Sequence, residues 1–494
     1  MRPTVLLFNP ISTSKGKQRL PMSLLAIASV IAQDYAVEML DGNLIDDPAQ
    51  AIIARATATQ ARLLGVTVMP GPQLRQAVEV CARIKQALPE LTILWGGYFP
   101  SNHYETVLKS AYVDYVIIGQ GEAAFRKFVD LFFTGGSLND VPSLAYRHAD
   151  GTLTVTPRAP FVNLNNLPTY PYDLLDMPQY VGKSYLGTRV LSHHSSWGCP
   201  FSCNFCAVVP LAQKRWLAEN AERVVNTMRQ LKTRYNIDGM EFHDMDFFVH
   251  EGRSEAIAEG MMGLGITWWG LGRVDTLMTY QDSTFKKMVQ SGLKMVFMGA
   301  ESGSDDTLKL MNKGGKSGTH QTIEIVKRMK AFGIVPELSF VMGNPPDPVA
   351  DVAQTIDFIR KLKRIDPAIE LVLYLYTPTP QEGSVLLDET MRAGYAFPQT
   401  LEEWASPEWS KRSLRRDPKT PFASDPVRNH VRDFETVINA YYPTVTDVRL
   451  QGAMRTLLKV LAGWRYRTGF YRAPYELKAL QRVLHYRRPE TMGF

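Results

Sequence analysis

The sequence predicts an α/β fold with two consecutive parallel sheets and a mainly helical C-terminal region. Two observations carry this prediction. Short apolar runs alternate with amphipathic stretches over residues 1–140, and six further strand-like runs alternate with helical stretches over 190–395. Such βαβα alternation is typical of parallel sheets covered by helices. With 494 residues, 45% of them hydrophobic and 21% charged, the chain has the composition of a globular protein of several domains.

Residues 1–140 form the first predicted domain, a parallel sheet with helices on both faces. We expect its strands at Val5–Asn9, Ala36–Leu40, Leu63–Met69, Thr92–Gly97 and Tyr115–Gly119, and its helices at Pro21–Gln33, Asp47–Arg62, Leu74–Leu88 and Glu122–Phe133. Glycines gather where strands end, at Gly71, Gly96, Gly97, Gly119 and Gly121. Each of them alone is an ordinary turn residue. Ligands of open α/β sheets nevertheless bind at this edge, where the backbone must come close to them.

Residues 141–189 differ in character and predict a linker. Ala149-Asp150-Gly151 is typical of a hairpin turn. The prolines that follow interrupt any regular pattern, at Pro157, Pro160, Pro168 and Pro171. We expect the segment Tyr172–Met177 to dock between two domains.

Residues 190–395 form the second predicted domain. Its six strand-like runs are Val190–Trp197, Met240–His243, Ile266–Arg273, Met295–Glu301, Glu337–Met342 and Ile369–Tyr376. In barrels of parallel strands, active groups gather at the carboxyl ends of the strands. The polar residues at or after these ends are therefore candidates for chemistry, namely Asp244, Asp246, Arg273, Glu301 and Ser302, and Ser339 within the fifth run is a further candidate.

Three of the four cysteines lie in one CxxxCxxC run after the first of these strands, at Cys199, Cys203 and Cys206. Iron–sulfur clusters are usually held by four thiolates, so three imply an iron that another ligand must fill. A zinc site with His193 or His194 is the alternative, but zinc ligands usually come from two separate knuckles and the chain has one. A disulfide framework is not needed in a chain of this length.

The cysteine run, with Phe205 before its third cysteine, resembles the cluster-binding loop of the radical S-adenosylmethionine (SAM) enzymes. The resemblance implies a partial (β/α)6 barrel and a [4Fe–4S] cluster held by Cys199, Cys203 and Cys206. It implies that SAM fills the open iron and is cleaved to methionine and a 5′-deoxyadenosyl radical. The electron would come from a donor such as flavodoxin or ferredoxin.

The same resemblance implies SAM contacts elsewhere in the barrel. Asp244 and Asp246 are similar to the family's Asp-Asp-x-Phe segment and would accept from the ribose hydroxyls or the methionyl ammonium. Asp246 also suits the first turn of a helix. Arg273 has the fork geometry for the SAM carboxylate. In the run Gly299–Ser304, which matches the family's Gly-x-Glu-Ser-Gly, Glu301 would accept from the ammonium and Ser302 would lie near the carboxylate. Ser339 would reach the ribose.

The first domain resembles the Rossmann-like cobalamin-binding domain that precedes the radical SAM core in a large class of enzymes. Trp95-Gly96-Gly97 and Gly119-Gln120-Gly121-Glu122 carry this resemblance. It implies cobalamin contacts at Thr67, Gly71, Gly96, Gly97, Gly119, Gly121 and Glu122. Where histidine-ligating relatives have Asp-x-His-x-x-Gly, this chain has Asp41-Gly42-Asn43. Cobalamin would therefore be bound without a histidine from the chain; alternatively, the domain is a scaffold without corrin.

Two chemistries follow from this combination of domains. The first is cobalamin-dependent C-methylation of an unactivated carbon on a small-molecule or amphiphilic substrate. The alternative is a radical cyclisation or oxidative rearrangement, with or without cobalamin. Cys81 is the only cysteine outside the run, so relatives with auxiliary clusters are disfavoured. A regulator that binds SAM or corrin without turnover would not need a reducible cluster.

Residues 396–494 predict basic amphipathic helices, with basic and aromatic residues mixed from Trp464–Arg467 to Tyr486–Arg488. They form either a helical cap on the barrel or a surface for anionic lipid or an amphiphilic substrate. A net charge of +6 without a recognised module argues against nucleic acid. The N-terminus has no signal-peptide pattern and no run of about 18 apolar residues is present, so we expect a cytoplasmic protein.

Overall fold

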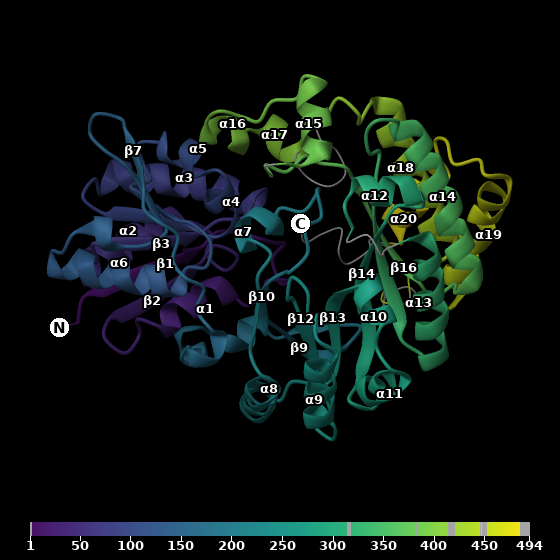
Figure 1. Cartoon of the computed structure of the whole chain (residues 1–494), viewed down its shortest axis with the longest axis horizontal. Helices are drawn as coiled ribbons and strands as arrows, with labels where there is room; N and C mark the ends of the chain where they lie inside the picture. The colour runs from purple at the N-terminus through teal and green to yellow at the C-terminus, as the bar shows by residue number, and fades with distance from the viewer. Residues whose placement is uncertain are drawn as a thin grey trace.

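The structure is a computed structural model that describes residues 2–313, 318–381, 383–412, 420–444, 446 and 452–484. It has two sheets side by side, each covered by helices, with a helical C-terminal region (Figure 1). The predicted fold class is confirmed. Tyr486–Arg488, part of the predicted basic aromatic run, lie outside the described residues.

The first sheet has a parallel part of five strands in the order β2-β1-β3-β4-β5. These strands are β1 (Thr4–Asn9), β2 (Ala36–Asp41), β3 (Leu63–Thr67), β4 (Thr92–Gly96) and β5 (Tyr115–Ile117). Their apolar runs are buried, as in sheets covered on both faces. One face is covered by α1 (Met22–Ser29) and α6 (Glu122–Thr134). The other is covered by α2 (Pro48–Thr59), α3 (Pro72–Ala87), α4 (Tyr98–Asn102) and α5 (Tyr104–Leu108).

The predicted hairpin turn at Ala149–Gly151 is confirmed and extends this sheet. It joins β6 (Leu144–Arg147) to β7 (Leu153–Val155), which continue the sheet in antiparallel order beyond β5. The chain then runs through short 3-10 turns. Tyr172 and Met177 are buried in one core cluster with Leu20 and Met22 from the first domain and with barrel residues. This segment therefore packs between the two sheets.

The second sheet has six parallel strands in sequence order, matching the six predicted runs. They are β9 (Gly187–His193), β12 (Gly239–Phe242), β13 (Thr267–Arg273), β14 (Leu293–Glu301), β15 (Val335–Met342) and β16 (Glu370–Leu375), with β8 (Gly182–Ser184) antiparallel at one edge. The sheet curls into a half-barrel. The surrounding helices are α8 (Ala221–Tyr235), α9 (Glu251–Met261), α10 (Val274–Met278), α11 (Asp282–Gln290), α12 (Asp305–Leu310), α13 (Thr319–Phe332) and α14 (Pro348–Ile365).

The first of these strands is shorter than the run Val190–Trp197 predicted. β9 ends at His193, and Ser196–Gly198 forms a separate strand, β10, which pairs antiparallel with β11 (Trp216–Ala218). The chain turns here because the Asp244 carboxylate accepts hydrogen bonds from the Ser195 amide and from both serine hydroxyls, those of Ser195 and Ser196. The cysteine loop and α7 (Val208–Ala212) lie in the segment of the chain that joins β10 to β11.

The helices after the barrel lie in two places. α16 (Leu401–Ala405) and α17 (Pro407–Arg412) follow α15 (Val385–Arg392) and extend over the gap between the sheets to the first domain, where Trp404 packs against Phe99. The other helices, α18 (Asp425–Tyr441), α19 (Gly452–Thr468) and α20 (Tyr475–Val483), pack beside α14 on the far side of the barrel. The predicted cap is therefore divided between both domains.

Candidate active site

The cysteine loop lies at the carboxyl edge of the half-barrel. Cys203 is buried, while Cys199 and Cys206 are partly exposed. Burial raises the pKa of Cys199 to about 12 and that of Cys206 to about 11, so both thiols need a metal centre to lose their protons near neutral pH. In the described ranges, no three His, Cys, Asp or Glu side chains converge on a single metal ion.

Two aromatic side chains support the loop. Phe205 packs against Met311, Tyr376 and Leu386, and its ring centroid is 5.8 Å from the Lys313 ammonium. Phe201 lies under the Arg273 guanidinium at 3.8 Å. The loop is thus held from the neighbouring strands before any cofactor is present.

Arg273, at the end of β13, holds the loop directly. Its Nη1 lies 3.1 Å from the Cys203 sulfur, and its Nη2 donates to the Lys313 carbonyl at 2.7 Å. The fork of the guanidinium is engaged by Asp275, with Nε and Nη2 at 2.9 and 2.8 Å from the carboxylate oxygens. The predicted pairing of this fork with a SAM carboxylate would require Asp275 to move away, and it stays a prediction.

Glu301 and Lys313 form a buried ion pair of 2.5 Å beside the loop. Glu301 has a φ of +65°, and the pairing of β14 with β15 shifts register at this point. Such strained, bulged positions are typical of functional sites. Both side chains fold over Gly299, where a Cβ would collide with them. The predicted contact of Glu301 with the SAM ammonium stays a prediction.

The two aspartates after β12, Asp244 and Asp246, differ in the hydrogen bonds that their carboxylates accept. Asp244 is fully buried and its oxygens are taken by Ser195 and Ser196. Asp246 is equally buried, yet neither carboxylate oxygen has a hydrogen-bond partner of good geometry among the described residues, although the Phe248 amide lies close enough to lower the pKa of the carboxyl. Burial raises the pKa of Asp246 to about 7, against the pull of Arg273 and Lys313. A buried carboxylate whose oxygens lack hydrogen bonds is a candidate acceptor for a donor on a bound ligand, such as the SAM ammonium.

This contrast gives the first prediction. Asp246→Asn should stabilise the enzyme without SAM at pH 8 and weaken SAM binding, because the substitution removes a buried charge that has no partner. An acid whose folded pKa is raised costs stability above its unfolded pKa, so the gain is absent below about pH 4 and complete above about pH 7. Thermal unfolding across this pH range and SAM titration would measure both effects.

Asp244→Asn is the matched control. It removes the charge but breaks a satisfied network, so it should lower stability by about 1–3 kcal/mol. If both variants change stability in the same direction, Asp246 does have a partner in the protein and its assignment to the SAM site fails.

Ser302 and Ser339 differ in their surroundings. The Ser302 hydroxyl donates to Asp351 at 3.1 Å on α14, and the Ser304 amide donates to that hydroxyl. Ser339 lies on β15 beside Gly299, on the inner side of the barrel. Ser302 is thus held by α14, while Ser339 remains placed for the predicted ribose contact.

Asp351 was missed by the sequence analysis. Its carboxylate also accepts from the amides of Gly343 and Asn344, so it ties the ends of β14 and β15 together. An acid in the first turn of a helix is common, and the sequence carries no signal that distinguishes this one.

The carboxyl edge of the first sheet brings its predicted residues together. Gly97 has a φ of +97°, and a Cβ there would lie 3.1 Å from the Thr67 hydroxyl; Gly96 faces open space. Gly71 precedes α3, and Gly119 and Gly121 lie between β5 and α6. Glu122 is buried at the start of α6, where burial raises its pKa. Four of these glycines, Gly96, Gly97, Gly119 and Gly121, are partly exposed, so their backbone is accessible at this edge.

Asn43 stands where histidine-ligating relatives have their cobalt ligand. Its side-chain oxygen accepts from the amides of Ser12 and Thr13, and its nitrogen donates to Asp41. The amide is therefore used to close the loop after β1.

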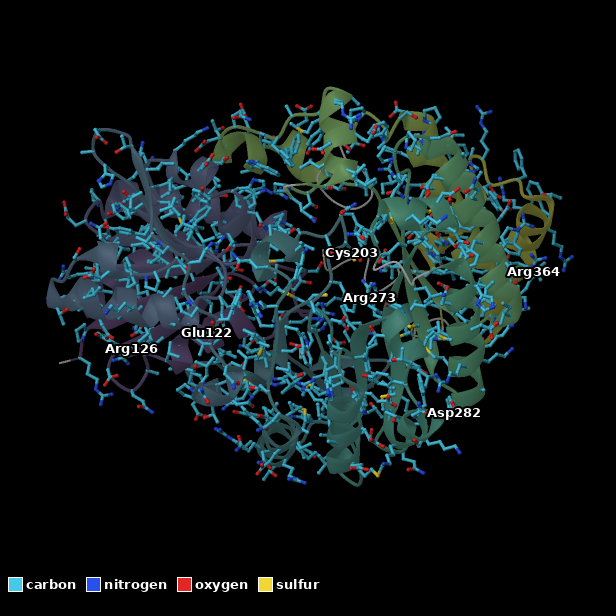
Figure 2. The ribbon with its side chains drawn as sticks, in the orientation of Figure 1. Glu122, Arg126, Cys203, Arg273, Asp282 and Arg364 are labelled. Carbon is cyan, nitrogen blue, oxygen red and sulfur yellow. The ribbon has the colours of Figure 1, made fainter. Side chains whose placement is uncertain are left out.

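The two carboxyl edges meet at the cysteine loop. α4, which follows Gly97, packs against α7. Burial raises the pKa of Tyr98 in α4, and the nearby Cys206 thiolate raises the pKa of Tyr98 further. Figure 2 shows Cys203 and Arg273 near one another between the two sheets, with Glu122 on the side of the first sheet.

The inner face of the half-barrel carries a second polar group that the sequence did not indicate. Arg19, from the loop after β1, pairs with Glu241 at 3.2 Å, and His243 lies 2.9 Å from the same carboxylate. Burial acts to raise the pKa of Glu241, but Arg19 and His243 outweigh it and lower that pKa to about 2. The centroid of the His243 ring lies 5.0 Å from that of Trp269. The distance between the ring centroids of His243 and His194 is 6.4 Å.

Comparison with known proteins agrees with this geometry. A model described as the B12 binding domain matches residues 16–129, and the Radical SAM superfamily model matches residues 195–359. The chain is 29% identical over 346 residues to an uncharacterised methyltransferase of Pyrococcus horikoshii, covering 69% of this chain and 73% of that protein. It is 23% identical over 384 residues to an anaerobic magnesium-protoporphyrin IX monomethyl ester cyclase of Synechocystis, covering 75% and 74%.

A solved structure shares the fold over nearly the whole chain. It is the radical SAM methyltransferase TsrM from Kitasatospora setae with tryptophan substrate and a SAM analogue bound, at 17% identity and a TM-score of 0.68, covering 98% of both chains. The matched domains are those that bind cobalamin and that bind SAM with a [4Fe–4S] cluster. The chain is an enzyme and belongs to the radical SAM enzymes that contain a cobalamin-binding domain.

Proposed function

We propose that this enzyme cleaves SAM reductively at a [4Fe–4S] cluster held by Cys199, Cys203 and Cys206, and that it methylates an unactivated carbon with the help of cobalamin. The observation that supports this most is the meeting of the two carboxyl edges at the cysteine loop. Methylation by a radical route requires both cofactors beside one substrate carbon. Holding reacting groups together in this way contributes much of the rate of such reactions.

In this proposal, some residues of the chain hold the cysteine loop and others contact SAM. Arg273 and Phe201 hold the loop that carries the cysteines. Asp246 and the ion pair of Glu301 with Lys313 offer charged groups to the SAM ammonium and carboxylate. The cofactors supply the electron transfer and the methyl group, and the protein supplies binding and orientation.

The inner face of the half-barrel is where we place the substrate. Glu241 lies on β12 and Trp269 on β13, and their side chains are on the face opposite the one that packs against α8 and α9. His243 directly follows β12 and contacts both. Arg19 from the first domain completes the group. Together they offer one cation, one carboxylate, neutral imidazole and an aromatic surface to a small or amphiphilic molecule.

Radical cyclisation or oxidative rearrangement is the second candidate. The likeness to the magnesium-protoporphyrin IX monomethyl ester cyclase favours it. Under either chemistry we propose an electron donor such as flavodoxin or ferredoxin and a cytoplasmic location, in keeping with an oxygen-sensitive cluster.

Corrin content separates the two candidates. We expect the chain, produced anaerobically with hydroxocobalamin and an iron–sulfur supply and then desalted, to retain an equimolar amount of corrin in the base-off form by absorbance. A cluster spectrum without corrin would leave the first domain as a scaffold and would rule out cobalamin-dependent methylation.

Two glycines with open surroundings provide a matched pair for this experiment. Gly96 and Gly182 have no atom within 4 Å of an added Cβ, and neither has a positive φ. Gly96→Leu should therefore fold normally but fill the space in front of the first sheet and exclude corrin. Gly182→Leu, at the edge of the second sheet, should retain it. Full corrin in the Gly96 variant would show that cobalamin binds elsewhere.

A further inference from the structure

The outer side of α19 exposes an apolar face. It is formed by Met454, Leu457, Val460, Leu461 and Trp464, with Val460 69% and Trp464 53% exposed. Their spacing of three and four residues places them on one side of the helix. The opposite side, with Leu458, Ala462 and Tyr466, is buried in the barrel core cluster. Single exposed apolar residues are normal, but a contiguous row of them marks an interaction surface.

Aromatic residues extend this apolar face beyond the helix. The exposed Phe470 ring stacks on Trp464 with centroids 5.8 Å apart. Tyr475 at the start of α20 is also exposed. Tryptophan and tyrosine are enriched at the boundary between lipid and water, where their rings meet the headgroups.

The segment that contains α19 and α20 is mainly basic. Residues 452–484 contain seven basic residues and one acidic residue, in a chain whose net charge is +6. The single acid, Glu476, is paired with Arg465 at 3.0 Å. Arg467, on α19 three residues after Trp464, and Arg472 and Arg482, in the segment that follows, are exposed, while Lys459 lies beside Tyr441 of α18. An apolar helix face bordered by basic side chains complements an anionic lipid surface.

The face is also rigidly presented. Lys478 on α20 donates to Asp433 on α18 at 2.7 Å, and Tyr441 stacks on Tyr466 between α18 and α19. Figure 1 shows α19 and α20 at the end of the molecule opposite the first sheet.

We propose that this apolar face of α19 binds the surface of an anionic membrane, with Leu457, Val460 and Trp464 in the headgroup region and the basic residues on anionic lipid. In the part of the chain that the structure describes, no helix has the length and apolarity to cross a membrane. Attachment would therefore be at the surface. This inference does not depend on the reaction that the enzyme catalyses.

Vesicle sedimentation of the full-length enzyme would test the proposal. We expect association with vesicles of phosphatidylcholine and phosphatidylglycerol, little association with phosphatidylcholine alone, and release at high ionic strength. Val460→Glu should reduce association roughly tenfold, because a valine that would insert into the headgroup region is replaced by a charge of the wrong sign. The matched control is Val349→Glu on α14, since Val349 is 66% exposed in a region outside this face.

Three results would overturn the proposal. One is a lack of association of the wild-type enzyme with either vesicle. Another is equal association of Val460→Glu and wild type. The last is a dimer in solution that Val460→Glu disrupts while no vesicle is bound, which would make the face a contact between two copies of the chain. Corrin content and SAM cleavage are unaffected by any of these outcomes, so the proposed function is tested separately.

Discussion

We expect Cys203→Ala to abolish both the visible absorbance of the cluster and all SAM cleavage. Cys203 is the buried cysteine of the three, and its sulfur lies 3.1 Å from the Arg273 guanidinium. Its loss leaves two thiolates for three irons and a buried cation facing an alanine. Because no other cysteine lies near the loop, nothing in the chain replaces it as a ligand. Absorbance, iron content and 5′-deoxyadenosine formation would measure the loss.

Cys81→Ala is the matched control for this experiment. Cys81 is also buried and free, but it lies in the first domain against Trp95, whose indole nitrogen is 3.4 Å from its sulfur. The substitution should cost about 1 kcal/mol of stability and leave cluster and cleavage intact. If Cys203→Ala still cleaves SAM, the three cysteines do not hold the cluster and the proposed function fails.

Glu301→Gln should weaken SAM binding while the cluster stays in place. Glutamine keeps the shape of the side chain and tolerates the same backbone as glutamate, but it lacks the charge that faces Lys313 and, by our proposal, the SAM ammonium. A hydrogen bond to a charged group contributes about 1.5–3 kcal/mol, so we expect SAM affinity to fall roughly tenfold to a hundredfold. Equilibrium binding of SAM to the reconstituted enzyme would measure this.

Glu337→Gln provides the comparison for Glu301→Gln. Glu337 lies on the neighbouring strand β15 and accepts from the Trp269 indole at 3.0 Å, away from the ion pair with Lys313. Its substitution should leave SAM affinity unchanged. Equal weakening in both variants would indicate a general effect of charge inside the barrel, and an unchanged affinity of Glu301→Gln would show that the ammonium is placed wrongly.

Much of the fold was predictable because its signals are local. Each strand of both parallel sheets is an apolar run, and each is followed by a helical pattern or by turn residues. The end of the first barrel strand was predicted wrongly because Ser195 and Ser196 continue the strand-like pattern. The carboxylate that bends the chain there, Asp244, is 49 residues away from Ser195.

The amino-acid sequence by itself determined which chemistry this protein can support. The cysteine spacing, the glycines at the strand ends and the acids after barrel strands are short-range features, and they indicated a cluster, SAM and cobalamin without coordinates. The tertiary structure decided which side chains remain available: Arg273 is engaged by Asp275, Ser302 by Asp351, and Asp246 by no partner in the described residues. It also placed Arg19 beside Glu241 and turned the apolar side of α19 outward. The pairs Ser302–Asp351 and Arg19–Glu241 join residues far apart in the chain, and only packing brings them within hydrogen-bond distance.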